Sequence, residues 1–200
     1  MIGIITGDII NSKTSNPKIW LNVLKDILNR YGNEPKQWEV FRGDSFQLET
    51  LPEQALEAAL LIKATIKQFK KIDVRLAIGI GDKTYNSEKI TESNGSAFVN
   101  SGECFEDLKK TKLAIKSSVL PFDITMNLMF DLALLTIDNW TVTSAKLIKT
   151  TLENPDLNQE QLAKLYGSTQ GNISKGLKRG GIDEVFKLLH YYKTQIKSLC

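Results

Sequence analysis

Two aspartates that each follow a glycine are the residues best placed to do chemistry. Asp8 stands in Gly7-Asp8-Ile9 at the end of a β-branched run, and Asp44 stands in Gly43-Asp44 between two strand-like segments. Mg²⁺ takes hard oxygen ligands, often one or two carboxylates together with substrate phosphates. Metal ions held in this way stabilise the attacking and leaving oxygens of phosphoryl or nucleotidyl transfer. The alternative is that both aspartates are turn formers beside a glycine.

The segment 159–181 has the spacing of a helix-turn-helix, which we place at about 158–178. Such a motif needs a small residue where its two helices cross, and Ala163 supplies it. Gly167 follows four residues later and tolerates a positive φ in the turn. Ile173 then supplies the branched apolar side chain that docks the second helix, and Leu162, Leu165 and Leu177 complete the small core. Asn158 can cap the first helix, and Ser168 or Thr169 the second.

The second helix of this motif has a polar face that suits double-stranded DNA. Glutamine and asparagine bridge adenine edges in the major groove, and hydroxyl, lysine and arginine side chains contact phosphates. Gly176, in the middle of the helix, departs from the usual apolar residue and costs about 1 kcal/mol against alanine. The alternative is a helical hairpin with a solvated face. The predicted DNA-binding residues are Thr169, Gln170, Asn172, Ser174, Lys175, Lys178 and Arg179.

The distribution of charge favours a polyanionic partner for the carboxyl-terminal third. The whole chain of 200 residues has a formal net charge of +3. Residues 141–200 contain nine Lys or Arg and five Asp or Glu, a net charge of +4, so residues 1–140 carry −1. A basic region of this kind is typical of nucleic-acid binding, although a solvated surface would have the same composition.

The first hundred-odd residues alternate strand and helix patterns in the order β-α-β-β-α-β, with an additional helix and strand. This order predicts a ferredoxin-like, α+β domain with an antiparallel sheet and helices on one face. We place this domain at residues 1–119 and an all-helical domain at 120–200. The expected strands are 2–6 with 9–10, then 38–41, 45–48, 74–81 and 112–116. The later helices are 123–137, 142–153, 158–166, 169–178 and 182–198.

The strand 74–81 alternates between a large apolar face and a small one. Arg75, Ala77, Gly79 and Gly81 share the small face. A face of alanine and glycine lets either a helix or a ligand approach closely.

Composition points to a cytoplasmic protein with no membrane partner. Cys104 and Cys200 are far apart and lack metal-ligand spacing, so we expect reduced thiols. The apolar start carries Asp8 and no basic leader, which is not the pattern of a signal peptide. The stretch 119–137 contains a proline and two aspartates, which favours a buried amphipathic helix over a membrane span. Helix-turn-helix proteins usually dimerise, and helix 182–198 or 123–137 is the expected homodimer interface or, alternatively, internal core.

Three segments, ITGDII, FRGDSF and VRLAIGIG, resemble in that order the palm core of class III nucleotide cyclases and diguanylate cyclases. The resemblance implies that Asp8 and Asp44 bind the metal ions and that Ile9 contributes its carbonyl oxygen. Further on, GSAFVNSGECFEDL is similar to the cyclase segment GxxVNxAxRLxxL with one additional residue. This similarity places Asn100 on the ribose-orienting asparagine, which makes it the candidate catalytic residue.

The chain departs from the cyclases at the arginine that stabilises the transition state. That position, four residues after Asn100, is Cys104, and a neutral thiol cannot replace a guanidinium at a developing phosphate charge. The strand 38–42 also lacks the lysine that adenine-selecting cyclases keep. We therefore expect a degenerate palm domain. The nucleotide-binding candidates are Gly43, Arg42 and Asn100, with Lys109 and Lys110 as further cations.

As a whole the chain resembles the SatD family of bacterial proteins. The matching pieces are GDII, RGDSFQ, RLAIGIG, SxFxxSG at 96–102, Asp-x-Trp-Thr at 138–141 and the helix-turn-helix. We expect a DNA-binding transcriptional regulator whose first domain binds a nucleotide with Mg²⁺ or serves as a scaffold. The alternatives are an active nucleotidyl cyclase or nucleotidyltransferase that uses NTP and Mg²⁺, and a protein-interaction module.

Overall fold

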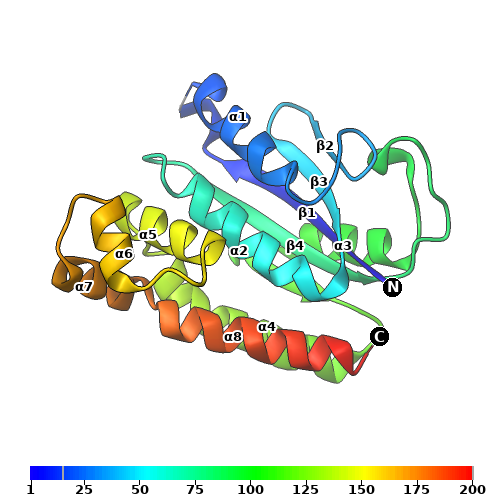
Figure 1. Cartoon of the computed structure of the whole chain (residues 1–200). Coiled ribbons are helices and arrows are strands. Elements are labelled where there is room, and N and C mark those ends of the chain that lie inside the picture. The colour runs from blue at the N-terminus through cyan, green and yellow to red at the C-terminus, as the bar shows by residue number, and fades with distance from the viewer. Residues whose placement is uncertain (15, 200) are drawn as a thin grey trace.

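The computed structural model describes residues 1–14 and 16–199, and Cys200 lies outside them. These residues form an α+β fold with one five-stranded sheet (Figure 1). The strands are β1 (Ile2–Ile10), β2 (Trp38–Phe41), β3 (Ser45–Thr50), β4 (Asp73–Gly81) and β5 (Leu113–Lys116). The helices are α1 (Pro17–Leu28), α2 (Ala55–Ile66), α3 (Ser96–Asp107), α4 (Leu120–Ile137), α5 (Val142–Glu153), α6 (Gln159–Leu165), α7 (Gln170–Gly180) and α8 (Ile182–Lys197).

The sheet is mixed, which corrects the expectation of a wholly antiparallel sheet. Its strand order is β2-β3-β1-β4-β5. The central strand β1 is antiparallel to both β3 and β4, whereas β5 is parallel to β4. The reason is that α3 carries the chain back to the starting end of β4, and a crossover of this kind joins parallel strands.

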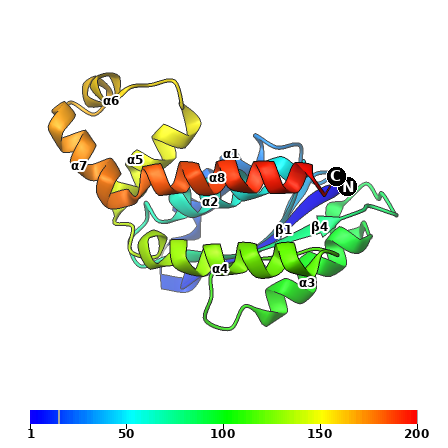
Figure 2. The same ribbon diagram turned by 90° about the horizontal axis from the view of Figure 1, so that it is seen from below.

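Helices cover both faces of the sheet rather than one, which is a second difference from the expectation. In Figure 2, α1 and α2 lie on one side of the sheet and α3 lies on the other. The two faces of β1 follow this division. Ile5 belongs to the main core with α1 and α2, whereas Ile4 packs with Ala97 and Phe98 of α3.

The small face of β4 is occupied by helix α3, so the close approach is made by a helix and not by a ligand. A Cβ atom at Gly79 would overlap the Ala97 carbonyl oxygen and the backbone nitrogen of Ser101. Ser101 in turn shares a buried 3.0 Å hydrogen bond with Thr6 of β1. The glycine and the two hydroxyls therefore fix α3 directly on the sheet.

One hydrophobic core runs through both predicted domains. Helix α5 packs on α2, and α8 returns along α4 to the start of α2, as Figures 1 and 2 show. The Tyr192 hydroxyl donates a buried hydrogen bond to the Pro52 carbonyl at 2.6 Å. Lys193 pairs with Glu57 close by. The last helix thus closes the core of the first 119 residues.

A buried charge cluster ties α2 and β4 to the end of α4. Lys63 is fully buried and lies 3.1 Å from an Asp73 carboxylate oxygen. Its Nζ also lies 2.8 Å from Oδ1 of Asp138, although the angle is not that of a hydrogen bond. Lys67 and Lys112 complete the cluster on Asp73. Burial raises the pKa of Asp73, but the neighbouring ammonium groups and a backbone hydrogen bond lower it by more, so its pKa lies below the ordinary value.

The Asp-x-Trp-Thr segment at 138–141 has a structural role at each named position. Asp138 joins the buried cluster. The Trp140 indole donates a buried 2.8 Å hydrogen bond to the carbonyl of Gly180 at the end of α7. Thr141 caps α5 by accepting from the backbone nitrogen of Ser144. This short segment therefore holds the end of α7 against the rest of the fold.

Candidate functional site

Helices α6 and α7 form two short helices joined by a tight turn, and each start is specified locally. Asn158 caps α6 and forms a reciprocal pair of hydrogen bonds with Gln161. Thr169 caps α7 by accepting from the backbone nitrogen of Asn172. Between the helices Gly167 has φ +56°, a left-handed conformation that glycine adopts without strain.

The two helices are docked by most of the side chains that the sequence spacing indicated, but the prediction for Leu165 was wrong, since its side chain is 64% exposed. Ala163, Ile173 and Leu177 are all buried, together with Leu162. Packing explains why position 176 is a glycine, because a Cβ there would lie 2.5 Å from Cδ1 of Leu147 on α5. The glycine that weakens α7 as a helix therefore lets α7 lie close against α5.

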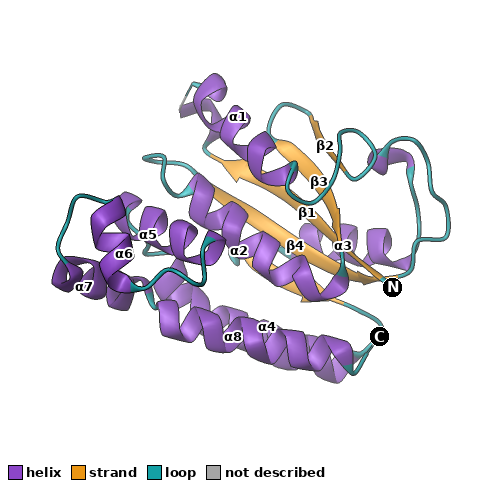
Figure 3. Cartoon of the chain, viewed as in Figure 1, coloured by secondary structure: helices purple, strands orange, loops and turns teal. Residues whose placement is uncertain are grey.

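The polar face of α7 points away from this small core. Figure 3 shows α6 and α7 at one end of the molecule, apart from the strands. Six of the seven predicted DNA-binding residues are exposed and Ser174 is half-buried. Among these seven side chains, and within the described residues, only that of Thr169 forms a hydrogen bond, the one that caps α7. The face is thus available to a partner.

A second group of predicted residues meets at one end of the sheet. Asp8, Ile9 and Asp44 line a single pocket of about 530 Å³. The register of the sheet produces this, since Asp8 pairs with Ser45 and the Ile9 amide donates to the Asp44 carbonyl at 3.0 Å. The end of the first strand therefore does lie beside the hairpin turn.

Both carboxylates of this pocket already have partners. Arg75 donates to both oxygens of Asp8, at 2.9 Å from Nε and 2.6 Å from Nη2. These hydrogen bonds raise the pKa of Arg75. Ser12 donates to Asp44 at 2.6 Å. A magnesium ion shared by the two aspartates would compete with Arg75 for the Asp8 oxygens. Across residues 1–14 and 16–199, no group of three or more His, Cys, Asp or Glu side chains could hold a metal.

The same pocket is rich in cations. Lys109 and Lys110 line it, as does Arg75. Sequence reasoning missed Lys13 and Lys112, which also line it. Lys13 follows Asp8 by only five residues, so the sequence could have placed it near the pocket. Lys112 reaches the pocket only because β5 pairs with β4. Arg75 pairs with Asp8, and Lys112 pairs with Asp73 and Asp138, so Lys13, Lys109 and Lys110 are the cations that make the lining suit an anion.

The remaining predicted residues lie outside this pocket. Arg42 and Gly43 form the hairpin turn, with φ +53° and +89°. Asn100 donates from Nδ2 to the Ile80 carbonyl at 2.8 Å, which attaches α3 to β4. Ile80 lies toward the opposite end of β4 from Arg75. Cys104 is buried, and burial raises the pKa of its thiol to about 12.

The geometry defines an α+β protein with an exposed polar helix at one end of the molecule and a basic pocket where the strands of its sheet end. The chain belongs to the SatD family, whose family model matches residues 1–196. No curated protein matches the chain.

Proposed function

We propose that the protein is a DNA-binding transcriptional regulator that reads double-stranded DNA with α7. The observation that carries this proposal is the exposed polar face of α7, while the apolar side chains of the same helix dock on α5 and α6. In a helix-turn-helix the second helix enters the major groove and its side chains reach base edges. Gln170 and Asn172 lie near the start of α7, where such contacts are made.

Specific duplex binding is the first expected result. We expect selection from random duplexes to give a preferred sequence, with affinity that falls steeply as salt rises. Lys175→Ala and Arg179→Ala should each weaken binding about tenfold and reduce the salt slope by roughly 0.9. Gln170→Ala should relax sequence preference. Fluorescence anisotropy with different duplexes at several salt concentrations measures the affinity, its salt slope and the sequence preference.

Lys18→Ala is the matched control, since Lys18 is an exposed lysine on α1, outside α6 and α7. Its affinity and salt slope should equal those of the wild type. A wild-type protein that retains no duplex at low salt, or α7 variants that behave like Lys18→Ala, would refute the proposal.

We propose further that residues 1–119 are a ferredoxin-like palm domain. The chain order β1-α1-β2-β3-α2-β4 and the spatial order β2-β3-β1-β4 support this assignment. Helix α3 and β5 are then an addition at the β4 edge. In this reading the basic pocket binds the phosphates of a nucleotide, with Lys109 and Lys110 in the place of the cyclase arginine. A buried, neutral thiol at Cys104 supports binding without turnover.

Nucleotide binding without consumption is the second expected result. A nucleoside triphosphate with Mg²⁺ or Mn²⁺ at about 100 times its Kd should stabilise the fold by about 2.7 kcal/mol, or roughly 5–10 °C in Tm. Lys109→Ala/Lys110→Ala and Asp44→Ala should each remove this shift, and Lys18→Ala should keep it. Chromatography of the same samples should show the nucleotide intact.

The other outcomes point to the competing functions. Turnover that is lost in Asp8→Ala or Asp44→Ala would make the protein a nucleotidyl cyclase or nucleotidyltransferase. No shift with any nucleotide, together with no duplex binding, would favour a protein-interaction module. We place the protein in the cytoplasm, where DNA and nucleotides occur and a free thiol such as Cys104 stays reduced.

A further inference from the structure

Helix α4 exposes a continuous row of aliphatic side chains, which we call the α4 stripe. Its members are 60–72% exposed, and they are Leu120, Ile124, Leu128, Leu132 and Leu135. Their spacing of three or four residues places them above one another on a single face of the helix. The stripe runs the length of α4.

The opposite face of α4 is buried, so α4 is apolar on both sides. Phe122, Met126 and Phe130 point into the core with Leu134 and Ile137. The sequence predicted an amphipathic helix here, but the face expected to be polar carries the α4 stripe instead. By length and composition α4 is also the single helix of the described residues able to cross a membrane. A helix that is hydrophobic all round is normally covered on every side.

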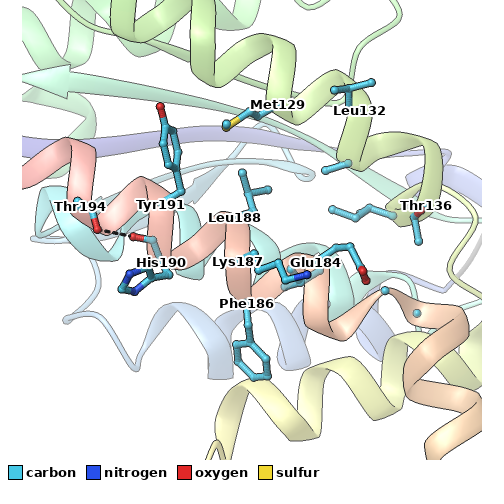
Figure 4. A pocket seen from close by; sticks show the side chains of 15 residues that line it. Met129, Leu132, Thr136, Glu184, Phe186, Lys187, Leu188, His190, Tyr191 and Thr194 are labelled. Carbon is cyan, nitrogen blue, oxygen red and sulfur yellow. Dashed lines mark hydrogen bonds between the residues drawn. The ribbon is translucent and has the colours of Figure 1, made fainter.

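A groove beside the stripe enlarges the apolar surface. It has a volume of about 990 Å³ and lies between α4 and α8. Leu132 belongs to both the stripe and the groove, so the two surfaces are continuous. Figure 4 shows Leu188 and Tyr191 of α8 pointing toward α4, with Met129 on the facing helix.

We propose that the α4 stripe and this groove form a homodimer interface, in which a second copy of the chain packs α4 against α4 about a two-fold axis. The exposed stripe alone presents on the order of 500 Å², which is the size of the largest patch on a typical monomer. Together with the groove it approaches the roughly 800 Å² per partner of a standard interface. A two-fold axis covers the same surface on both copies at once.

The charges around the surface favour a second copy over a bilayer. Asp131 is the charged residue on the outer face of α4, and Glu184 and Lys187 border the groove from α8. Helices that lie on anionic membranes carry many lysines and arginines on the polar side, and this rim has one cation and two anions. Charges of both signs at the rim can pair across a two-fold interface.

The position of the surface gives the dimer a role, which rests on the proposed binding of DNA by α7. Gly180 and Gly181, where α7 ends and α8 begins, line the same groove. A dimer formed there holds two α7 helices in a fixed relation, which is what two half-sites of an operator require.

Sedimentation velocity on the full chain without DNA tests the interface directly. We expect the wild type to sediment as a dimer at micromolar concentration. Leu128→Glu/Leu132→Glu should weaken dimerisation at least 100-fold and sediment as a monomer with wild-type circular dichroism. Ile19→Glu, at an exposed apolar residue of α1, should remain a dimer. A monomeric wild type, or a stripe variant that stays dimeric, would overturn the proposal.

Cross-linking gives a reading that does not depend on a folded glutamate variant. In a Cys200→Ser background, Leu128→Cys should be linked between chains by a short bis-maleimide, and Ile19→Cys should not. Equal linking at both positions would overturn the proposal. Wild-type binding to vesicles with anionic lipids that the stripe variant loses would assign the surface to a membrane instead. Because DNA is absent throughout, failure of the dimer is distinguishable from failure of DNA binding.

Discussion

Gly79→Val should unfold the protein at temperatures where the wild type is fully native. The valine Cβ would overlap backbone atoms of Ala97 and Ser101 and lie 2.7 Å from the Ser101 side chain. Overpacking usually costs about 1–3 kcal/mol, but here the obstacle is backbone, which cannot rotate away. We therefore expect a loss of about 4 kcal/mol or more, or roughly 10 °C in Tm, measured by urea and thermal denaturation.

Gly102→Ala is the matched control for this effect. Gly102 lies inside α3, and a Cβ added there would meet no atom of another element within 4 Å. Alanine at such a helical position should stabilise the fold by about 0.5–1 kcal/mol. If Gly79→Val unfolded at the same urea concentration as Gly102→Ala, the close contact of α3 with β4 would be wrong.

Lys63→Met should produce the second large loss of stability. The substitution keeps the length of the side chain and removes the buried ammonium group, which leaves Asp73 and Asp138 without their central partner. Removing one member of a buried ion pair typically costs about 3–5 kcal/mol, because the remaining charge stays desolvated. Equilibrium unfolding in urea measures the loss.

Lys193→Met serves as the comparison, since the Lys193–Glu57 pair is partly exposed to solvent. An exposed pair contributes about 0–1 kcal/mol. The double variant Lys63→Met/Asp73→Asn should not recover the loss, because Lys67 and Lys112 also pair with Asp73. Equal effects of Lys63→Met and Lys193→Met would show that the cluster adds no stability.

The elements that local sequence specifies were predicted well. The alternation of large and small residues from Val74 to Ile80 predicted β4, because successive side chains of a strand point to opposite faces of the sheet. The starts of α6 and α7 were predicted because Asn158 and Thr169, the latter one of two candidates, each accept from a backbone nitrogen only three residues away. Signals of this kind need no knowledge of the rest of the fold.

The features that were not predicted depend on residues far apart in the chain. The side of the sheet that α3 covers follows from Gly79 and Ser101 meeting across 22 positions. The pairing of Asp8 with Arg75 follows from the register of β1 with β4. Lys63 has the sequence context of a surface lysine on a helix, and its burial appears only when β4 and α4 are in place. No periodicity within one segment contains this information.

The same difference separates the residues predicted to bind a metal ion from Asn100, which was predicted to bind a nucleotide. Asp8 and Asp44 were expected beside each other because a strand end and a hairpin turn are neighbours in this topology, and they line one pocket. Asn100 was placed by resemblance to a motif, and its amide is used to attach α3 to β4. Lys109 and Lys110 line the pocket together with Asp8 and Asp44, whereas Asn100 lies outside it.

The path of α8 sets the order in which the chain can be completed during synthesis. The central strand β1 leaves the ribosome well before Tyr192 and Lys193, which cover Pro52 and Glu57. Until they emerge, the apolar surface around the start of α2 has no cover, and such surfaces promote aggregation of nascent chains. Shortened forms that end before α8 are therefore expected to depend on chaperones, and neither predicted domain is a suitable unit for separate expression.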